Sequence, residues 1–247
     1  MVLLTRKTLV LAKIESTYGS DPTPSASTDA FLTMGTDVKR NFTAIQRDVQ
    51  LASLTRKKDV GKERFTEVTF KYELVGSGAA ATAPRTGILL QACGFAETVN
   101  SPTDVTYAPS STSLKSITLY VYKDGMRHIV TGCVGTFTLT CTAGNQAMLE
   151  FTFTGKYADK TDTAFPTPTY ETTVDNPPLC VSAGLTYNST SFVVNEVGVD
   201  MANTVSKRPS INEAFAIAGF QITDRKPSVT FDPEAELVAT YDLKMMS

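Results

Sequence analysis

The sequence predicts an all-β protein with one short flanking helix. Thr occurs 37 times and Val 21 times among the 247 residues, and β-branched side chains favour strands over helices. Segments that alternate apolar and polar residues recur at short intervals, with turn-forming residues between them. The length suits one large β domain, so we expect residues 1–247 to form a single domain.

An extended N-terminal arm is expected over residues 1–30. Residues 15–30 have weak hydrophobic periodicity, and the apolar residues before them are interrupted by Arg6, Lys7 and Lys13. We therefore expect no export signal. Residues 44–64 are equally weak in periodicity, which is typical of an arm or loop.

A strand is predicted over residues 65–75. Its residues place Val68, Phe70 and Tyr72 on one face and Glu67 and Lys71 on the other. Strict alternation of this kind indicates a strand with one buried and one wet face.

The one predicted helix covers residues 85–96. It follows the Gly- and Ala-rich residues 76–81, its apolar side chains cover much of its surface, and Gly94 provides a C-terminal stop. We expect this helix to pack on a sheet.

A three-stranded meander is predicted from residue 114 to residue 157. Residues 114–123 and 126–142 flank Asp124 and Gly125, and an Asp-Gly pair between strands favours a type I′ hairpin turn. Gly132 and Gly135 indicate a bulge in the second strand. Residues 146–157 alternate again and form the third strand.

The C-terminal part begins with a Pro- and Thr-rich connector over residues 158–178. Residues 179–247 are expected to form the C-terminal strands, at residues 179–187, 192–200, 214–223 and 235–243. These strands either complete the main fold or form a small added domain, and we favour one continuous domain.

No residue pattern indicates catalysis, a cofactor or a metal site. The one histidine, His128, follows the hairpin turn without a nucleophile motif, so we expect an exposed strand residue. The four cysteines lack C-x-x-C spacing, and we interpret them as buried free thiols: Cys93, Cys133, Cys141 and Cys180. No apolar stretch is long enough for a membrane span. The net charge of −2 argues against a protein that binds DNA through an excess of basic residues.

The whole chain resembles the major tail tube proteins of long-tailed bacteriophages with non-contractile tails. The resemblance rests on the order of several segments, none of which is a catalytic signature. These are residues 11–22 (LAKIESTYGSDP), 70–78 (FKYELVGSG), 83–95 (APRTGILLQACGF), 105–109 (VTYAP), 132–138 (GCVGTFT), 151–155 (FTFTG), 225–227 (RKP) and 232–234 (DPE).

The resemblance implies a structural subunit of the virion tail, with a β-sandwich or barrel fold of the tail tube type. Such subunits assemble in the host bacterial cytoplasm into hexameric rings, and the rings stack around a tape-measure protein, between tail terminator and distal tail proteins. Double-stranded DNA passes through the lumen without specific binding. We expect a predominantly negative lumen, because many Lys or Arg contacts to phosphates would hold the DNA. Residues 65–75 and 146–157 are the candidate lumen strands.

The resemblance also implies a long loop that contacts the adjacent ring. This loop matches residues 50–64, between a strand that ends near Val49 and one that begins at Phe65. Its basic residues would pair with acids on the next ring, although charge runs are usually solvated. They are Arg56, Lys57, Lys58, Lys62 and Arg64.

Three other functions compete with this hypothesis. Composition does not separate a tube subunit from another phage tail or virion protein, such as a tail terminator or a decoration protein. A β-sandwich binding or adhesion module would normally have an export signal and exposed Trp, and the chain contains no Trp. An enzyme is the third alternative.

Overall fold

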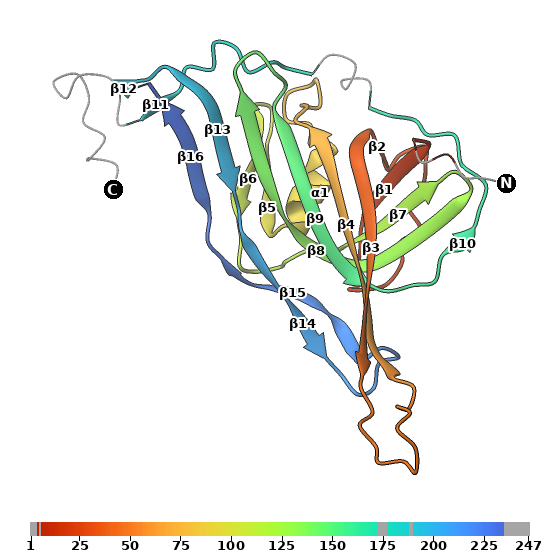
Figure 1. Ribbon diagram of the computed structural model, residues 1–247. Helices are drawn as coiled ribbons and strands as arrows, with labels where there is room; N and C mark the ends of the chain where they lie inside the picture. The colour runs from red at the N-terminus through yellow and green to blue at the C-terminus, as the bar shows by residue number, and fades with distance from the viewer. Residues whose placement is uncertain (1–3, 5, 172–176, 188–189, 235–247) are drawn as a thin grey trace.

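The computed structural model describes residue 4 and residues 6–171, 177–187 and 190–234. Within these residues the chain forms strands and one short helix, α1 (Thr86–Ala92), so the predicted all-β class is confirmed. Figure 1 shows a curled sheet with α1 behind it and a long hairpin that extends below the rest of the molecule.

The main sheet is antiparallel and runs in the order β2-β1-β7-β8-β9-β4-β3. Two strands, β13 and β16, continue it beside the second half of β8, and β10 pairs with the start of β8. The strands are β1 (Thr8–Ile14), β2 (Ala30–Phe31), β3 (Thr33–Ile45), β4 (Val60–Glu73), β7 (Ile117–Lys123), β8 (Met126–Thr142), β9 (Met148–Lys156), β10 (Thr161–Asp162), β13 (Val194–Asp200) and β16 (Ser228–Pro233).

Three small hairpins attach to this sheet. They pair β5 (Phe95–Asn100) with β6 (Asp104–Pro109), β11 (Thr186–Tyr187) with β12 (Thr190–Ser191), and β14 (Asn203–Pro209) with β15 (Ile217–Arg225).

The predicted meander is confirmed as β7, β8 and β9. Asp124 and Gly125 have φ angles of 40° and 91°, as the hairpin turn requires. The register between β8 and β9 shifts between Thr131 and Val134, around Gly132, whose φ is 61°. This bulge bends β8, which pairs with β7 along its first half and with β13 along its second half.

The hydrophobic core lies between the layer formed by β1 and β7 and the layer formed by β4 and β9. Val68 and Phe70 of β4, as well as Phe151 and Phe153 of β9, are fully buried in it. The rings of Phe151 and Phe153 stack with their centroids 5.6 Å apart. Leu89 and Ala92 of α1 pack into the same core, so the helix flanks the sheet as predicted.

The prediction of an arm over residues 1–30 is wrong for β1 and β2. β1 lies between β2 and β7 and is buried on both faces. Val10 and Ala12 enter the main core, whereas Leu9 and Leu11 pack with Tyr120 and other residues in a second cluster. A strand covered on both faces does not alternate apolar with polar residues, so its periodicity is weak.

The helix is shorter than the predicted residues 85–96, and the prediction of its C-terminal end is wrong. It ends at Ala92, Gly94 adopts a φ of 85°, and Phe95 already begins β5. Gly94 therefore does act as the stop, but the apolar residues after it belong to a strand.

The C-terminal strands differ in part from the prediction. β13 and β15 fall within or near the predicted residues 192–200 and 214–223, and β13 joins the main sheet through β8. β14 and β16 were not predicted, and only residues 186–187 of the predicted 179–187 form a strand. The connector over residues 158–178 contains β10 in its described part. The strand predicted at residues 235–243 lies outside the described residues.

Candidate assembly surfaces

One face of the main sheet is polar and is open except at the end that the β14–β15 hairpin covers. On β4 and β9, buried aromatic residues alternate with Thr and charged residues, as in Phe70 and Thr69 or Phe151 and Glu150. Cross-strand pairing places Thr138 of β8, Glu150 of β9 and Lys71 of β4 in one row. The predicted wet face of residues 65–75 therefore continues across several strands.

We call this surface the polar face. Acidic residues outnumber basic ones on it, and most of its remaining side chains are threonines. Its members on β3, β4, β8, β9 and β13 are Asp37, Lys39, Glu67, Thr69, Lys71, Glu73, Thr136, Thr138, Thr140, Thr142, Glu150, Thr152, Thr154, Glu196 and Asp200.

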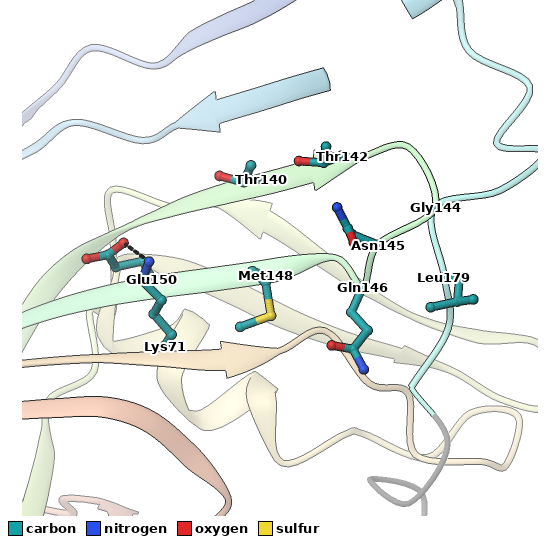
Figure 2. Close-up of a pocket in the computed structure, with 9 residues that line it drawn as sticks. All are labelled: Lys71, Thr140, Thr142, Gly144, Asn145, Gln146, Met148, Glu150 and Leu179. Carbon is teal, nitrogen blue, oxygen red and sulfur yellow. Dashed lines mark ion pairs between the residues drawn. The ribbon is translucent and has the colours of Figure 1, made fainter. Parts of the chain in front are cut away.

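A shallow depression of about 610 Å³ lies at the end of the polar face near Gly144. Figure 2 shows Lys71 and Glu150 at one side of it and the hydroxyls of Thr140 and Thr142 on the neighbouring strand. The Lys71 Nζ lies 3.4 Å from the Glu150 carboxylate. The residues that line the depression include neither His nor Cys, and the described residues contain no group of His, Cys, Asp and Glu that could hold a metal ion.

His128 is buried, so the prediction of an exposed histidine is wrong. It lies on the same face of β8 as Val130, two residues further on, which belongs to the main core. Burial, together with the positive charges of Arg40, Lys123 and Lys160, lowers the pKa of His128 to about 4. The imidazole is therefore neutral at pH 7 and does not serve as a general acid at the surface.

The cysteine prediction holds for two of the four residues. Cys93 and Cys133 are buried thiols, and burial raises the pKa of both. Cys141 and Cys180 are also free, but they are only half-buried.

The loop predicted over residues 50–64 is instead the tip of the β3–β4 hairpin. β3 ends at Ile45 and β4 begins at Val60, so the residues without strand pairing are 46–59, which we call the hairpin tip. Figure 1 shows that this tip projects beyond the rest of the molecule. Leu54 within it is fully exposed, and Val49 and Leu51 are also exposed.

The structure divides the five basic candidates between the hairpin tip and its base. Arg56, Lys57 and Lys58 lie in the tip, and Arg56 has Asp59 at 4.0 Å. Lys62 and Arg64 lie on β4 instead of the loop, because the strand extends further than its alternation predicts. Within the described residues, Lys57 and Lys58 have no ion pair within 4.0 Å.

Arg64 and Lys62 have partners within the same chain. The Arg64 guanidinium lies 5.6, 5.9 and 5.2 Å from the ring centroids of Phe42, Tyr157 and Phe215. Lys62 contacts Glu63 at 3.2 Å, and Glu63 also accepts a hydrogen bond of 2.8 Å from Lys207. These ion pairs lower the pKa of Glu63. The two ion pairs of Glu63 and the packing of Arg64 among aromatic rings therefore stabilise the base of the hairpin.

The β14–β15 hairpin braces the same base. Lys207 of β14 and Phe215, which precedes β15, supply the contacts just described, and Phe220 of β15 packs on Phe65 with a centroid distance of 5.8 Å. Figure 1 shows the two hairpins side by side at the lower end of the molecule. Sequence reasoning missed this brace because the partners are far apart in the chain.

The segment after β1 fastens several strands together, a role that sequence reasoning also missed. The buried Glu15 carboxylate accepts hydrogen bonds from the Ser116 and Thr118 hydroxyls at 2.6 and 2.7 Å, and from the backbone N–H groups of Gly19 and Gly132 at 2.6 and 2.7 Å. The Tyr18 hydroxyl donates to the Gly132 carbonyl and accepts from the Phe220 N–H at 2.6 Å. An acid in a Ser- and Thr-rich turn gives no sequence signal of burial.

Comparison with known proteins extends these observations to the whole chain. A family model described as phage tail tube protein matches residues 5–247. A search of curated proteins finds no match. Among the described residues, no helix combines the length and apolar character needed to cross a membrane.

Proposed function

The chain belongs to the phage tail tube protein family and is a structural component of the virion tail, and from this premise we propose that it forms hexameric rings that stack into a DNA-conducting tube. The tube would enclose a tape-measure protein and end at tail terminator and distal tail proteins. It would assemble in the cytoplasm of the host bacterium. No enzymatic step is part of this proposal.

The polar face is the observation that carries the proposal. In the proposed ring, the polar faces of the six subunits surround a common lumen. A surface of threonines and carboxylates offers DNA phosphates few cationic contacts. DNA binding tightens with each phosphate that a Lys or Arg neutralises. The low number of basic side chains on the polar face therefore favours sliding of DNA over retention.

An open edge of the sheet supports closure of such a ring. Within the described residues, β3 pairs only with β4. An unpaired strand edge is prone to pair with another chain. In the proposed ring, the β3 edge of one subunit pairs with a strand of its neighbour, and the sheets join into a barrel around the lumen.

The hairpin tip is the proposed contact between rings. We expect Arg56, Lys57 and Lys58 to face acids on the next ring, whereas Lys62 and Arg64 act within the subunit at the base of the hairpin. Reversal of the three tip residues to Glu should shorten or abolish tubes while the subunits stay folded. Tubes of normal length at physiological salt would contradict this assignment.

Negative-stain electron microscopy of the purified protein tests the proposed function. We expect hollow tubes, or rings with six-fold symmetry at low concentration. Compact monomers at high protein concentration would contradict a tube subunit.

A further inference from the structure

Two exposed surfaces lie at opposite ends of the molecule. The hairpin tip projects at one end, and β11, β12 and the start of β13 lie at the other (Figure 1). When identical subunits stack head to tail, one end of each subunit meets the opposite end of the next. The two ends should then be complementary.

The end opposite the tip carries a cleft of about 420 Å³, which we call the end cleft. Most of the residues that line it are apolar, and the exposed Glu196 is among the polar ones. Val181 is 59% exposed, and so is the neighbouring Val193. The lining includes Cys141, Cys180, Val181, Leu185, Val194 and Val197.

The charge at the end cleft is negative. Its lining contains no Lys or Arg, and its one charged residue is Glu196. A second acid lies beside it, because the Asp232 carboxylate of β16 accepts a hydrogen bond of 2.7 Å from the Glu196 N–H. A cationic partner with apolar side chains therefore fits this end of the molecule.

The hairpin tip carries both exposed apolar side chains and an excess of positive charge. Leu54 is fully exposed and lies between Val49 and Leu51 on one side and the basic residues 56–58 on the other. The tip carries four basic and two acidic side chains: Arg47, Arg56, Lys57, Lys58, Asp48 and Asp59. An exposed leucine side chain followed closely by a run of basic residues matches an apolar cleft with a carboxylate at its rim.

We propose that the end cleft receives the hairpin tip of a second copy of this chain in the next ring, with Leu54 inserted between its apolar walls and Lys57 and Lys58 beside Glu196. This inference rests on the proposed tube function and names the receiving surface of the stacking contact. The contact is heterologous and does not close on itself, so it can repeat along a tube.

Cysteine cross-linking tests the assignment without removing Leu54. Ser53→Cys places a thiol in the exposed tip, next to Leu54, and Cys180 is already present in the end cleft. A short bismaleimide should link Ser53→Cys subunits of assembled tubes into dimers and longer ladders on denaturing gels. Replacement of Cys141 and Cys180 by Ser should remove the ladder. The matched control Ser111→Cys, an exposed residue between β6 and β7, should give at least tenfold less dimer.

The outcomes separate the receptor assignment from the tube function. Tubes that form with Ser53→Cys but give no ladder dependent on Cys141 or Cys180 would overturn the assignment and leave the tube function intact. Failure of the unaltered chain to form rings or tubes would contradict the proposed function itself, and the assignment with it.

A charge exchange provides a second test if the cysteine variant does not assemble. Lys57→Glu with Lys58→Glu should shorten tubes at least threefold, and Glu196→Lys alone should also shorten them. The combination of all three changes should restore more than half of the lost length. Equal or greater shortening in the combined variant would overturn the assignment of Glu196 as the partner.

Discussion

The two faces of the strands β4, β9 and β8 carry opposite chemistry on the same backbone. On one face, Phe70, Phe151 and Phe153 are fully buried in the main core. On the other, Thr152 and Glu150 belong to the polar face, where the apolar packing is confined to the end that the β14–β15 hairpin covers. The alternation of a strand thus lets adjacent residues serve separate purposes, one the stability of the subunit and the other the proposed lumen.

The largest expected effect tests the buried face. Phe151→Ala should lower the free energy of unfolding by about 3–5 kcal/mol, because it leaves a cavity among packed aromatic rings. The adjacent Thr152→Ala is the matched control and should change it by less than about 0.5 kcal/mol. Urea denaturation monitored by circular dichroism measures both values. Similar losses for the two variants would contradict the division between the faces.

A second prediction concerns Glu15, whose carboxylate is buried. Glu15→Ala should lower the free energy of unfolding by about 3 kcal/mol, because the Ser116 and Thr118 hydroxyls and the Gly132 N–H lose a charged acceptor in a buried site. Glu15→Gln keeps one acceptor oxygen and should cost less. Urea denaturation of both variants, at matched pH, measures the difference, and an unchanged midpoint for Glu15→Ala would refute the proposed fastening role.

A third prediction concerns pH and the buried His128. Its pKa in the folded protein is about 4, below the usual value of 6.5, so the unfolded chain binds the proton more readily between these values. Stability should therefore fall as the pH decreases from about 6.5 to about 4, and this contribution should level off below that range. His128→Phe removes the titration and should flatten this part of the profile. Parallel curves for the two proteins in urea titrations would argue against the buried neutral imidazole.

The smallest effect on folding is expected on the polar face. Glu67→Lys with Glu150→Lys should lower the free energy of unfolding by no more than about 1 kcal/mol per residue, because both side chains are partly exposed and the largest loss is the replacement of the Lys71–Glu150 pair by two lysines. The same pair should increase DNA retention by assembled tubes at low salt, and the retention should disappear as salt rises. Filter binding over a salt series measures this, with Lys71→Ala as a control that removes a positive charge. Equal retention by variant and unaltered tubes would mean that the polar face does not meet DNA.

The contrast between a buried and a polar face also explains which strands the sequence predicts. β4, β8 and β9 have buried residues on one face and partly exposed residues on the other, and their alternation reveals them. β7 is buried on both faces, but its aliphatic residues alternate with Thr and Tyr, and the Asp124-Gly125 turn follows it. β1 is buried on both faces, so Val10 and Leu11 give no alternating signal. The short helix α1 was found because Gly94 marks its end, but its length was overestimated where apolar residues pass directly into β5.

The candidate surfaces were predicted less completely than the strands. A basic run at residues 56–58 is visible in the sequence, and so is the wet face of residues 65–75. The partners of Arg64, by contrast, come from β3, from the residue after β9 and from the loop before β15. Such contacts depend on the sheet order and on how the two hairpins pack, and local sequence patterns do not encode either.

A cryo-electron microscopy reconstruction of the assembled protein tests the central claim most directly. We predict a hollow tube of stacked rings in which the polar face, with Glu67, Thr138 and Glu150, lines the lumen. A tube with this face on its outer surface, or a particle without a lumen, would contradict the account.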